Sequence, residues 1–220
     1  MHTDNNTDRV ETARQLYDTS IIKLLEQRQL SYPPENLYLR IFKSERELEV
    51  WGSNGETFTL LKTYSFTAFS GKLGPKHREG DLQIPEGFYH IDLFNPKSNY
   101  LLSMRVSYPN KADRIRNKNE KEIGGDIFIH GSNKSIGCIP IGDENIRELY
   151  WLCWKYHLSK ASKIPVHIFP FRMSQENLDL HHSGYSDFWQ QLEPAYSSFE
   201  SKHKPGSISV DDNGNYIFTP

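Results

Sequence analysis

The chain opens with a helical pattern of apolar residues. Between positions 10 and 29, apolar side chains recur every three or four residues among polar ones: Val10, Ala13, Tyr17, Ile21, Leu24 and Leu25. This spacing puts them on one face, so the segment is predicted to form an amphipathic helix. Pro33 and Pro34 predict where it ends, because proline cannot continue a helix.

An alternating pattern takes over after position 36. Leu37, Leu39 and Ile41 alternate with other residues, and Leu48 and Val50 do the same. A period of two predicts strands, here with one buried and one solvated face. Further strands are expected at residues 57–68, 88–93, 100–106, 126–130 and 165–169. The first of these strands are expected to form a meander.

Glycine, proline and charged residues mark the segments between these elements. Residues 71–87 are too rich in glycine and proline for a long element and predict a shaped loop. The charged residues 111–122 predict a mobile flap. Asp143 is placed to cap a helix that runs to about Leu158, and an aromatic helix is expected around residues 185–196. An Asn-Gly pair at 213–214 predicts a tight hairpin near the end of the chain.

The composition and the predicted elements together indicate the size of the core and the fold class. The 220 residues are 36% hydrophobic, which is enough for one ordinary core, and the elements predict a mostly β fold with helices, of the α+β class. With 26 basic and 28 acidic residues, the formal charge of -2 argues against a nucleic-acid partner. No apolar run approaches the roughly 20 residues that span a bilayer, so no integral membrane segment is expected.

One segment holds the residues with catalytic potential. An apolar strand brings His130 to its end, and a short glycine-containing turn returns Cys138 directly after Gly137. An imidazole beside a thiol can take its proton and stabilise the thiolate. Gly137 leaves room for a substrate carbonyl, and the Cys138 amide can face the oxygen that becomes negative. Taken alone, a histidine near a cysteine more often reflects packing than catalysis.

The motifs around this pair resemble those of a known family. His130-Gly131 followed by Ser135-Ile136-Gly137-Cys138 is similar to the signature of the L,D-transpeptidase catalytic domain, or YkuD, family. Further similar segments lie upstream at residues 70–76, 79–81, 85–89 and 107–114, in the same order. The resemblance covers roughly residues 37–171 and fits the YafK-like branch. Ile139 and Pro140 depart from the basic or polar residue that many members carry after the cysteine.

The resemblance implies a fold and a domain organisation. It implies an L,D-transpeptidase-like β-sandwich catalytic domain with flanking helices over residues 37–171. Residues 1–36 would form an N-terminal helix and linker, and residues 172–220 a helical and hairpin extension packed on the same domain. The implied site of action is periplasmic, so an export signal is expected to have preceded residue 1, since residues 1–8 do not form the apolar core of a signal peptide.

The resemblance also implies a reaction without metal or cofactor. Cys138 would attack the carbonyl of a meso-diaminopimelate residue in a peptidoglycan stem peptide and form a thioester, while His130 moves the proton. A backbone carbonyl commonly orients the imidazole in this family. Ser135 and Gly137 flank the pocket and are candidates to supply that carbonyl or an oxyanion donor.

Other residues are assigned to substrate or to structure. Contacts with the substrate are expected from Arg105, Lys134 and Gly131, with Lys76 and Arg114 as further partners for its carboxylates; the alternative for the cations is solvated charge. Cys153 is expected to fill the core, and Asn110 and Asp113 to cap or close a turn. Adjacent His181 and His182 cannot share a metal. Packing roles are expected for His90, His167 and Trp189.

The fate of the thioester stays open at this point. Transfer to an amine would form crosslinks, whereas water would cleave the stem peptide or release a lipoprotein attached through its C-terminal lysine. Ile139 and Pro140 favour cleavage, because residues after the cysteine are expected to line the place where donor and acceptor meet. A third alternative is a non-catalytic wall-binding module.

Overall fold

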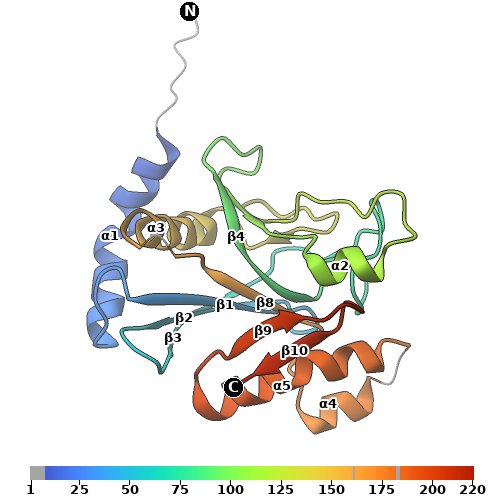
Figure 1. The fold of residues 1–220 in the computed structure, drawn as a ribbon. Coiled ribbons are helices and arrows are strands. Elements are labelled where there is room, and N and C mark those ends of the chain that lie inside the picture. Colours follow the sequence, from blue (N-terminus) through green and yellow to red (C-terminus); the bar gives the residue numbers. More distant parts are fainter. Residues whose placement is uncertain (1–7, 161, 182–183) are drawn as a thin grey trace, which may run out of the picture.

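The main element of the structure is a mixed sheet of eight strands, in the order β3-β2-β1-β8-β4-β5-β6-β7 among the described residues (Figure 1). This computed structural model describes residues 8–160, 162–181 and 184–220. The strands are β1 (Asn36–Phe42), β2 (Glu47–Ser53), β3 (Thr59–Ser65), β4 (Gly87–Asn95), β5 (Ser103–Val106), β6 (Phe128–His130), β7 (Ile139–Pro140) and β8 (Pro165–Phe169).

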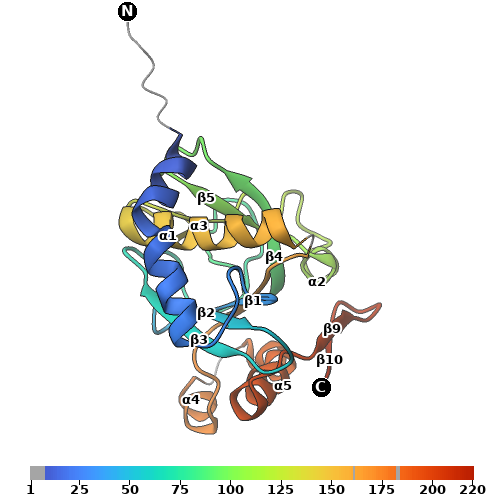
Figure 2. The ribbon, with the colours of Figure 1, turned by 90° about the vertical axis from the view of Figure 1, so that its left-hand side faces the viewer.

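Helices and a hairpin surround this sheet. The helices are α1 (Arg9–Gln27), α2 (Lys111–Arg116), α3 (Asp143–Ser159), α4 (Gln175–Leu180) and α5 (Ser186–Lys202), and the hairpin is β9 (Ser207–Val210) with β10 (Tyr216–Thr219). In both views, α1 and α3 lie on one side of β1, β2 and β3, and α5 lies on the other (Figures 1 and 2). The predicted α+β class with a mostly β centre is confirmed.

Strand β4 joins the two halves of the sheet. Its first residues, from Gly87 to His90, pair with β8, and its later residues, from Ile91 to Asn95, pair with β5. The register shifts between Ile91 and Leu93, where the partner changes. One half contains β5, β6 and β7 and carries His130. The other half contains β1, β2, β3 and β8.

The expectation that β1 is half-buried is wrong. Leu37, Leu39 and Ile41 pack into the core with α1 and α3, as the alternation predicts. The alternate residues are also buried, because α5 covers the second face: Tyr38 contacts Phe199, and Arg40 is 1% exposed and pairs with Glu200 at 2.7 Å. The charged residue inside this strand is therefore buried and paired, also with the buried Glu49 at 3.3 Å, and does not mark a solvated face.

Two local expectations are also corrected. The charged segment 111–122 begins as helix α2, whose Asn110 and Asp113 form a capping box, and the Asp113 side chain is buried. Helix α3 has Gly142 at its N-cap, while Asp143 accepts a hydrogen bond from the Ser132 amide at 2.6 Å. The predicted N-terminal helix, the 71–87 loop, the helix α5 and the terminal hairpin are confirmed.

Candidate active site

The turn between β6 and β7 brings the candidate histidine and cysteine together. These short strands pair in parallel, with Ile129 opposite Ile139 and His130 opposite Pro140. Cys138 therefore enters β7 beside the strand that carries His130. Both side chains line one cavity of about 180 Å³, together with Asn95, Ser98, Asn99, Tyr100, Ser103 and Phe128.

The environment of His130 favours a neutral imidazole. The ring is 2% exposed, and Tyr100 stacks on it with 4.5 Å between ring centres. His130 Nδ1 lies 2.5 Å from the carbonyl oxygen of Gly131, which can only accept, so the proton resides on Nδ1 and Nε2 keeps a lone pair. Burial lowers the pKa of His130, and the Gly131 carbonyl acts in the opposite direction. A neutral imidazole of this kind can serve as a base.

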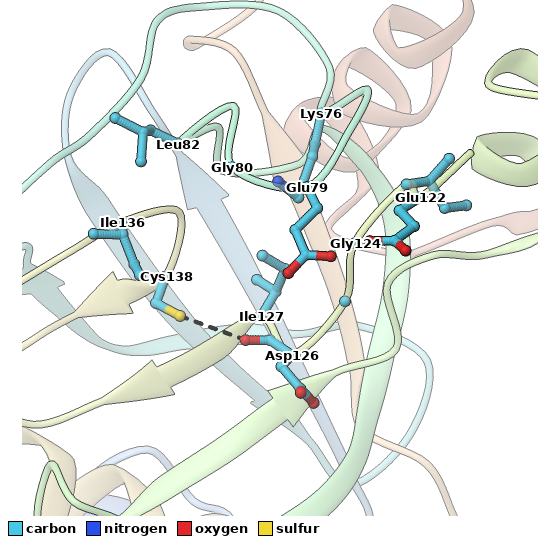
Figure 3. Close-up of a pocket in the computed structure, with 12 residues that line it drawn as sticks. Lys76, Glu79, Gly80, Leu82, Glu122, Gly124, Asp126, Ile127, Ile136 and Cys138 are labelled. Atoms are coloured by element: carbon cyan, nitrogen blue, oxygen red, sulfur yellow. Dashed lines mark hydrogen bonds between the residues drawn. The ribbon is translucent and has the colours of Figure 1, made fainter. Parts of the chain in front are cut away.

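The thiol of Cys138 is held in its protonated form. Its Sγ atom donates to the carbonyl of Asp126 at 3.6 Å (Figure 3), and burial raises its pKa. A contact with the Phe128 backbone lowers that pKa by less than burial raises it. The resting pair is thus a thiol and a neutral imidazole, so a base must remove the proton as the sulfur attacks.

Cys138 also lines a second, larger cavity of about 630 Å³. One wall comes from the 71–87 loop, with Lys76, Glu79, Gly80 and Leu82, and the opposite wall from residues 122–127 (Figure 3). Its carboxylates are Glu79, Glu122 and Asp126, whereas the Lys76 ammonium is already bound to Asp81 at 2.5 Å. The sulfur therefore faces two spaces, a small one shared with His130 and a larger one with acidic walls.

Ser135 and Gly137 shape the turn around the cysteine. Ser135 Oγ donates to the Cys138 carbonyl at 2.7 Å and accepts from the Gly137 amide at 3.2 Å. Gly137 has φ +122°, and a Cβ atom there would lie 3.0 Å from the Gln83 carbonyl, so glycine is required. The carbonyl that orients His130 comes from Gly131, not from Ser135 or Gly137.

Three of the expected substrate-binding cations, Arg105, Lys134 and Arg114, lie outside both cavities, whereas Lys76 lines the larger one. Arg105, on β5, pairs with Asp92 at 2.9 Å and Asp126 at 3.5 Å. Lys134 is exposed on the β6–β7 turn, and Arg114 is exposed on α2. Among the described residues that line the two cavities, none of these three occurs. Their contact with a substrate, and that of Gly131, stays a prediction.

Gly131 occupies a position where no larger residue fits. A Cβ atom there would lie 2.5 Å from Asp143 Oδ1 and 2.7 Å from the Tyr100 carbonyl. Its own carbonyl is the one that lies against His130 Nδ1. Ile139 and Pro140 are buried in β7 and do not occur among the described residues lining either cavity. The interpretation that they line the meeting place of donor and acceptor is therefore wrong.

The sequence did not indicate several residues of the site. Tyr100 stacks on the candidate base from a segment before β5, and Asp126 holds the thiol through a backbone atom, which no side-chain pattern reveals. Leu82 and Ile136 are exposed apolar residues on the wall of the larger cavity. An apolar residue between Ser135 and Gly137 was the one available signal for Ile136, whereas Leu82 lies far from the cysteine motif in the sequence and had none.

The residues assigned to packing lie away from the site, as predicted. Cys153 is fully buried in α3, Trp189 is 2% exposed, and the Nδ1 atoms of His90 and His167 bond to Ser107 and Tyr38. His181 stacks on Phe171, while His182 lies outside the described residues. Within residues 8–160, 162–181 and 184–220, no group of His, Cys, Asp and Glu is arranged to hold a metal ion, and no helix is long and apolar enough to cross a membrane.

Comparison with known proteins gives the family. A family model of the L,D-transpeptidase catalytic domain matches residues 36–155. YafK of Escherichia coli K12 is 36% identical over 202 residues, which cover 90% of this chain and 79% of YafK. The helical cell shape determining protein Pgp2 of Campylobacter jejuni, 19% identical, has a similar fold with a TM-score of 0.50 over 80% of this chain and 73% of that one. The chain therefore belongs to the L,D-transpeptidase catalytic domain (YkuD) family, in its YafK-like branch.

Proposed function

We propose that this protein is a cysteine-dependent acyl-transfer enzyme that acts on peptidoglycan stem peptides in the periplasm. Cys138 is the nucleophile and His130 the base, and the scissile bond follows a meso-diaminopimelate carbonyl. The observation that carries the proposal is the shared cavity, which is lined by a partly exposed thiol and by an imidazole whose Nδ1 is bound to a carbonyl. Family membership supports the cell wall as the substrate.

The chemistry follows from these two side chains. Sγ attacks the carbonyl carbon while Nε2 of His130 takes the thiol proton, which gives a tetrahedral oxyanion. The intermediate collapses to a thioester as the C–N bond breaks, and the leaving amine takes the proton from His130. Water or a new amine then attacks the thioester, His130 removes its proton, and the sulfur leaves as the thiol.

The two cavities suggest where each partner binds. The leaving amine and the attacking group both exchange a proton with His130, so both belong in the smaller cavity that His130 lines. The acyl part of the stem peptide would then bind in the larger cavity, which Cys138 also lines. This division accounts for a cysteine that faces two spaces.

We favour cleavage over the formation of crosslinks. The smaller cavity, about 180 Å³, has room for water or for one extended side chain. That volume fits a lysine leaving group followed by water, including the C-terminal lysine of a wall-attached lipoprotein. A second stem peptide could bring only its amine-bearing side chain into this space, and it would need further contacts outside it to compete with water.

Product analysis separates the alternatives. Enzyme is incubated with disaccharide tetrapeptide and, separately, with wall that carries attached lipoprotein, and products are identified by mass, with the Cys138→Ala variant as the control. Released lipoprotein and shortened stems are expected from the wild type only. Crosslinked dimers without protein release would contradict cleavage and favour transfer. No product, together with no carbapenem adduct on Cys138, would leave a wall-binding module.

A further inference from the structure

The loop that walls the larger cavity has no regular structure to hold its shape. Residues 71–86 contain neither helix nor strand, yet Lys76, Gly80 and Leu82 from this loop face the cavity beside Cys138 (Figure 3). The Asp81 carboxylate orders the middle of the loop from within, because it accepts from Lys76 Nζ and from three backbone amides of the same loop. The base of the loop is held by contacts from other elements, and these converge on Glu86.

Glu86 is the centre of a fully buried charged cluster. One carboxylate oxygen accepts from Lys43 Nζ at 2.8 Å and from the Gly74 amide at 2.6 Å, and the other accepts from Trp189 Nε1 at 2.8 Å. Lys43 Nζ also donates to the carbonyls of Gly74 and Ile84, each at 2.8 Å. Glu86 and Lys43 are both 0% exposed. Both ends of the loop are thus tied to one point.

The cluster brings the C-terminal helix α5 against the loop. Trp189 lies on α5, 103 residues from Glu86 along the chain. The ring of Tyr185, at the start of α5, packs so closely on Gly74 that a Cβ atom there would lie 2.4 Å from it. Helix α5 lies outside residues 36–155, which the family model matches. A segment beyond the matched domain therefore supports the cavity wall.

The other side of the loop touches the cysteine turn. The Gln83 carbonyl lies over Gly137, 3.0 Å from the place of a Cβ atom. Ser70 Oγ is within hydrogen-bond distance of the Leu82 carbonyl, at 3.0 Å, and of Ser135 Oγ, at 2.9 Å. Ser135 in turn donates to the Cys138 carbonyl. Hydrogen bonds and close packing thus connect α5 with the backbone of the candidate nucleophile.

We infer that Trp189 is a positioning residue, which acts through Glu86 to hold the 71–87 loop in the shape that forms the larger cavity. Loss of its N–H leaves one oxygen of a buried carboxylate without that donor. Glu86 and the Gly74 amide bound to it then shift, and the wall moves relative to Cys138. The consequence for turnover rests on the proposed function, whereas the consequence for the loop does not.

The test compares two tryptophans that donate to buried carboxylates. Trp189→Phe removes the bond to Glu86, and Trp51→Phe removes a bond of the same length, 2.8 Å, from Trp51 Nε1 to Glu49 on β2. Hydrogen–deuterium exchange of residues 71–87 is expected to rise in Trp189→Phe and to stay at the wild-type level in Trp51→Phe. Turnover of wall fragments is expected to fall about tenfold to a hundredfold in Trp189→Phe and less than about twofold in Trp51→Phe.

Each outcome decides the inference. Unchanged exchange of the loop in Trp189→Phe, or an equal rise in both variants, overturns it. Faster exchange with no turnover even in the wild type would keep the inference on the loop and remove the proposed function. If Trp189→Phe does not fold, benzothienylalanine at position 189 replaces the N–H with sulfur at nearly constant shape, and unchanged loop exchange there overturns the inference.

Discussion

Two regions of the molecule carry the same pair of residue types under different conditions. At the β6–β7 turn, Cys138 is partly exposed and shares a cavity with His130. In the interior, Cys153 on α3 is fully buried among apolar side chains, and His167 on β8 is buried between the rings of Tyr38 and Phe88. Burial raises the thiol pKa of both cysteines, so burial alone does not separate them. The two cysteines differ in their access to a cavity and to a base, which only Cys138 has among the residues described.

The two histidines differ in their partners. His130 faces a carbonyl that favours its protonated form, so it can take and return a proton. His167 lies beside the Tyr38 hydroxyl, and burial together with the charge of Arg40 lowers its pKa to about 3. A base that must hold a proton during a reaction needs the first environment. The second environment keeps a histidine neutral and makes it part of the packing.

The largest expected effect separates the two cysteines. Cys138→Ala should reduce turnover of wall fragments by about a thousandfold or more, because no other nucleophile replaces the sulfur. Cys153→Ala should keep most of the turnover and lower the free energy of unfolding by about 1 to 2 kcal/mol, since it leaves a small core cavity. Mass spectrometry of the products and urea unfolding measure the two quantities. Wild-type rates in Cys138→Ala would remove the distinction between the regions.

The second effect concerns the base. His130→Ala should lower kcat by about a hundredfold to ten-thousandfold, the usual contribution of a general base. His167→Gln should retain most of the turnover at pH 7, because its side chain contacts neither cavity among the described lining residues. Steady-state kinetics on the same wall fragment gives both values. A larger loss in His167→Gln than in His130→Ala would reverse the assignment.

The third effect is on stability against pH. His167 has an ordinary pKa of 6.5 when unfolded and about 3 when folded, so the unfolded chain binds more protons between these values. Wild-type stability should therefore fall as the pH drops from about 6.5 toward 3, by up to about 1.4 kcal/mol per pH unit from this group. The difference in unfolding free energy between wild type and His167→Gln should shrink over the same range. A constant difference would contradict the buried neutral histidine.

The smallest expected effect concerns Arg105, which lies outside both cavities. Arg105 is paired with Asp92 and Asp126 at a partly exposed site, and such pairs contribute about 0 to 1 kcal/mol. Arg105→Ala should change kcat/KM by less than about threefold, measured beside Lys134→Ala. A tenfold rise in KM for Arg105→Ala alone would instead support the contact with a substrate carboxylate that the sequence predicted.

The sequence by itself determined the local features. Periods of two and of three to four placed most strands and helices, because side chains alternate or turn with the backbone regardless of what covers them. The His-Gly and Ser-x-Gly-Cys motifs predicted the family, and the aromatic surroundings of Cys153 predicted its burial. These features are encoded within a few neighbouring residues.

Only the tertiary structure decided which side chains meet. The second face of β1 is buried because α5 lies over it, so Arg40 pairs with Glu200 instead of water. Tyr100 stacks on His130 from a separate segment of the chain. Glu86 and Trp189 meet although 103 residues separate them. Such contacts arise when distant segments pack, and no local pattern of apolar and polar residues specifies which distant segment supplies the partner.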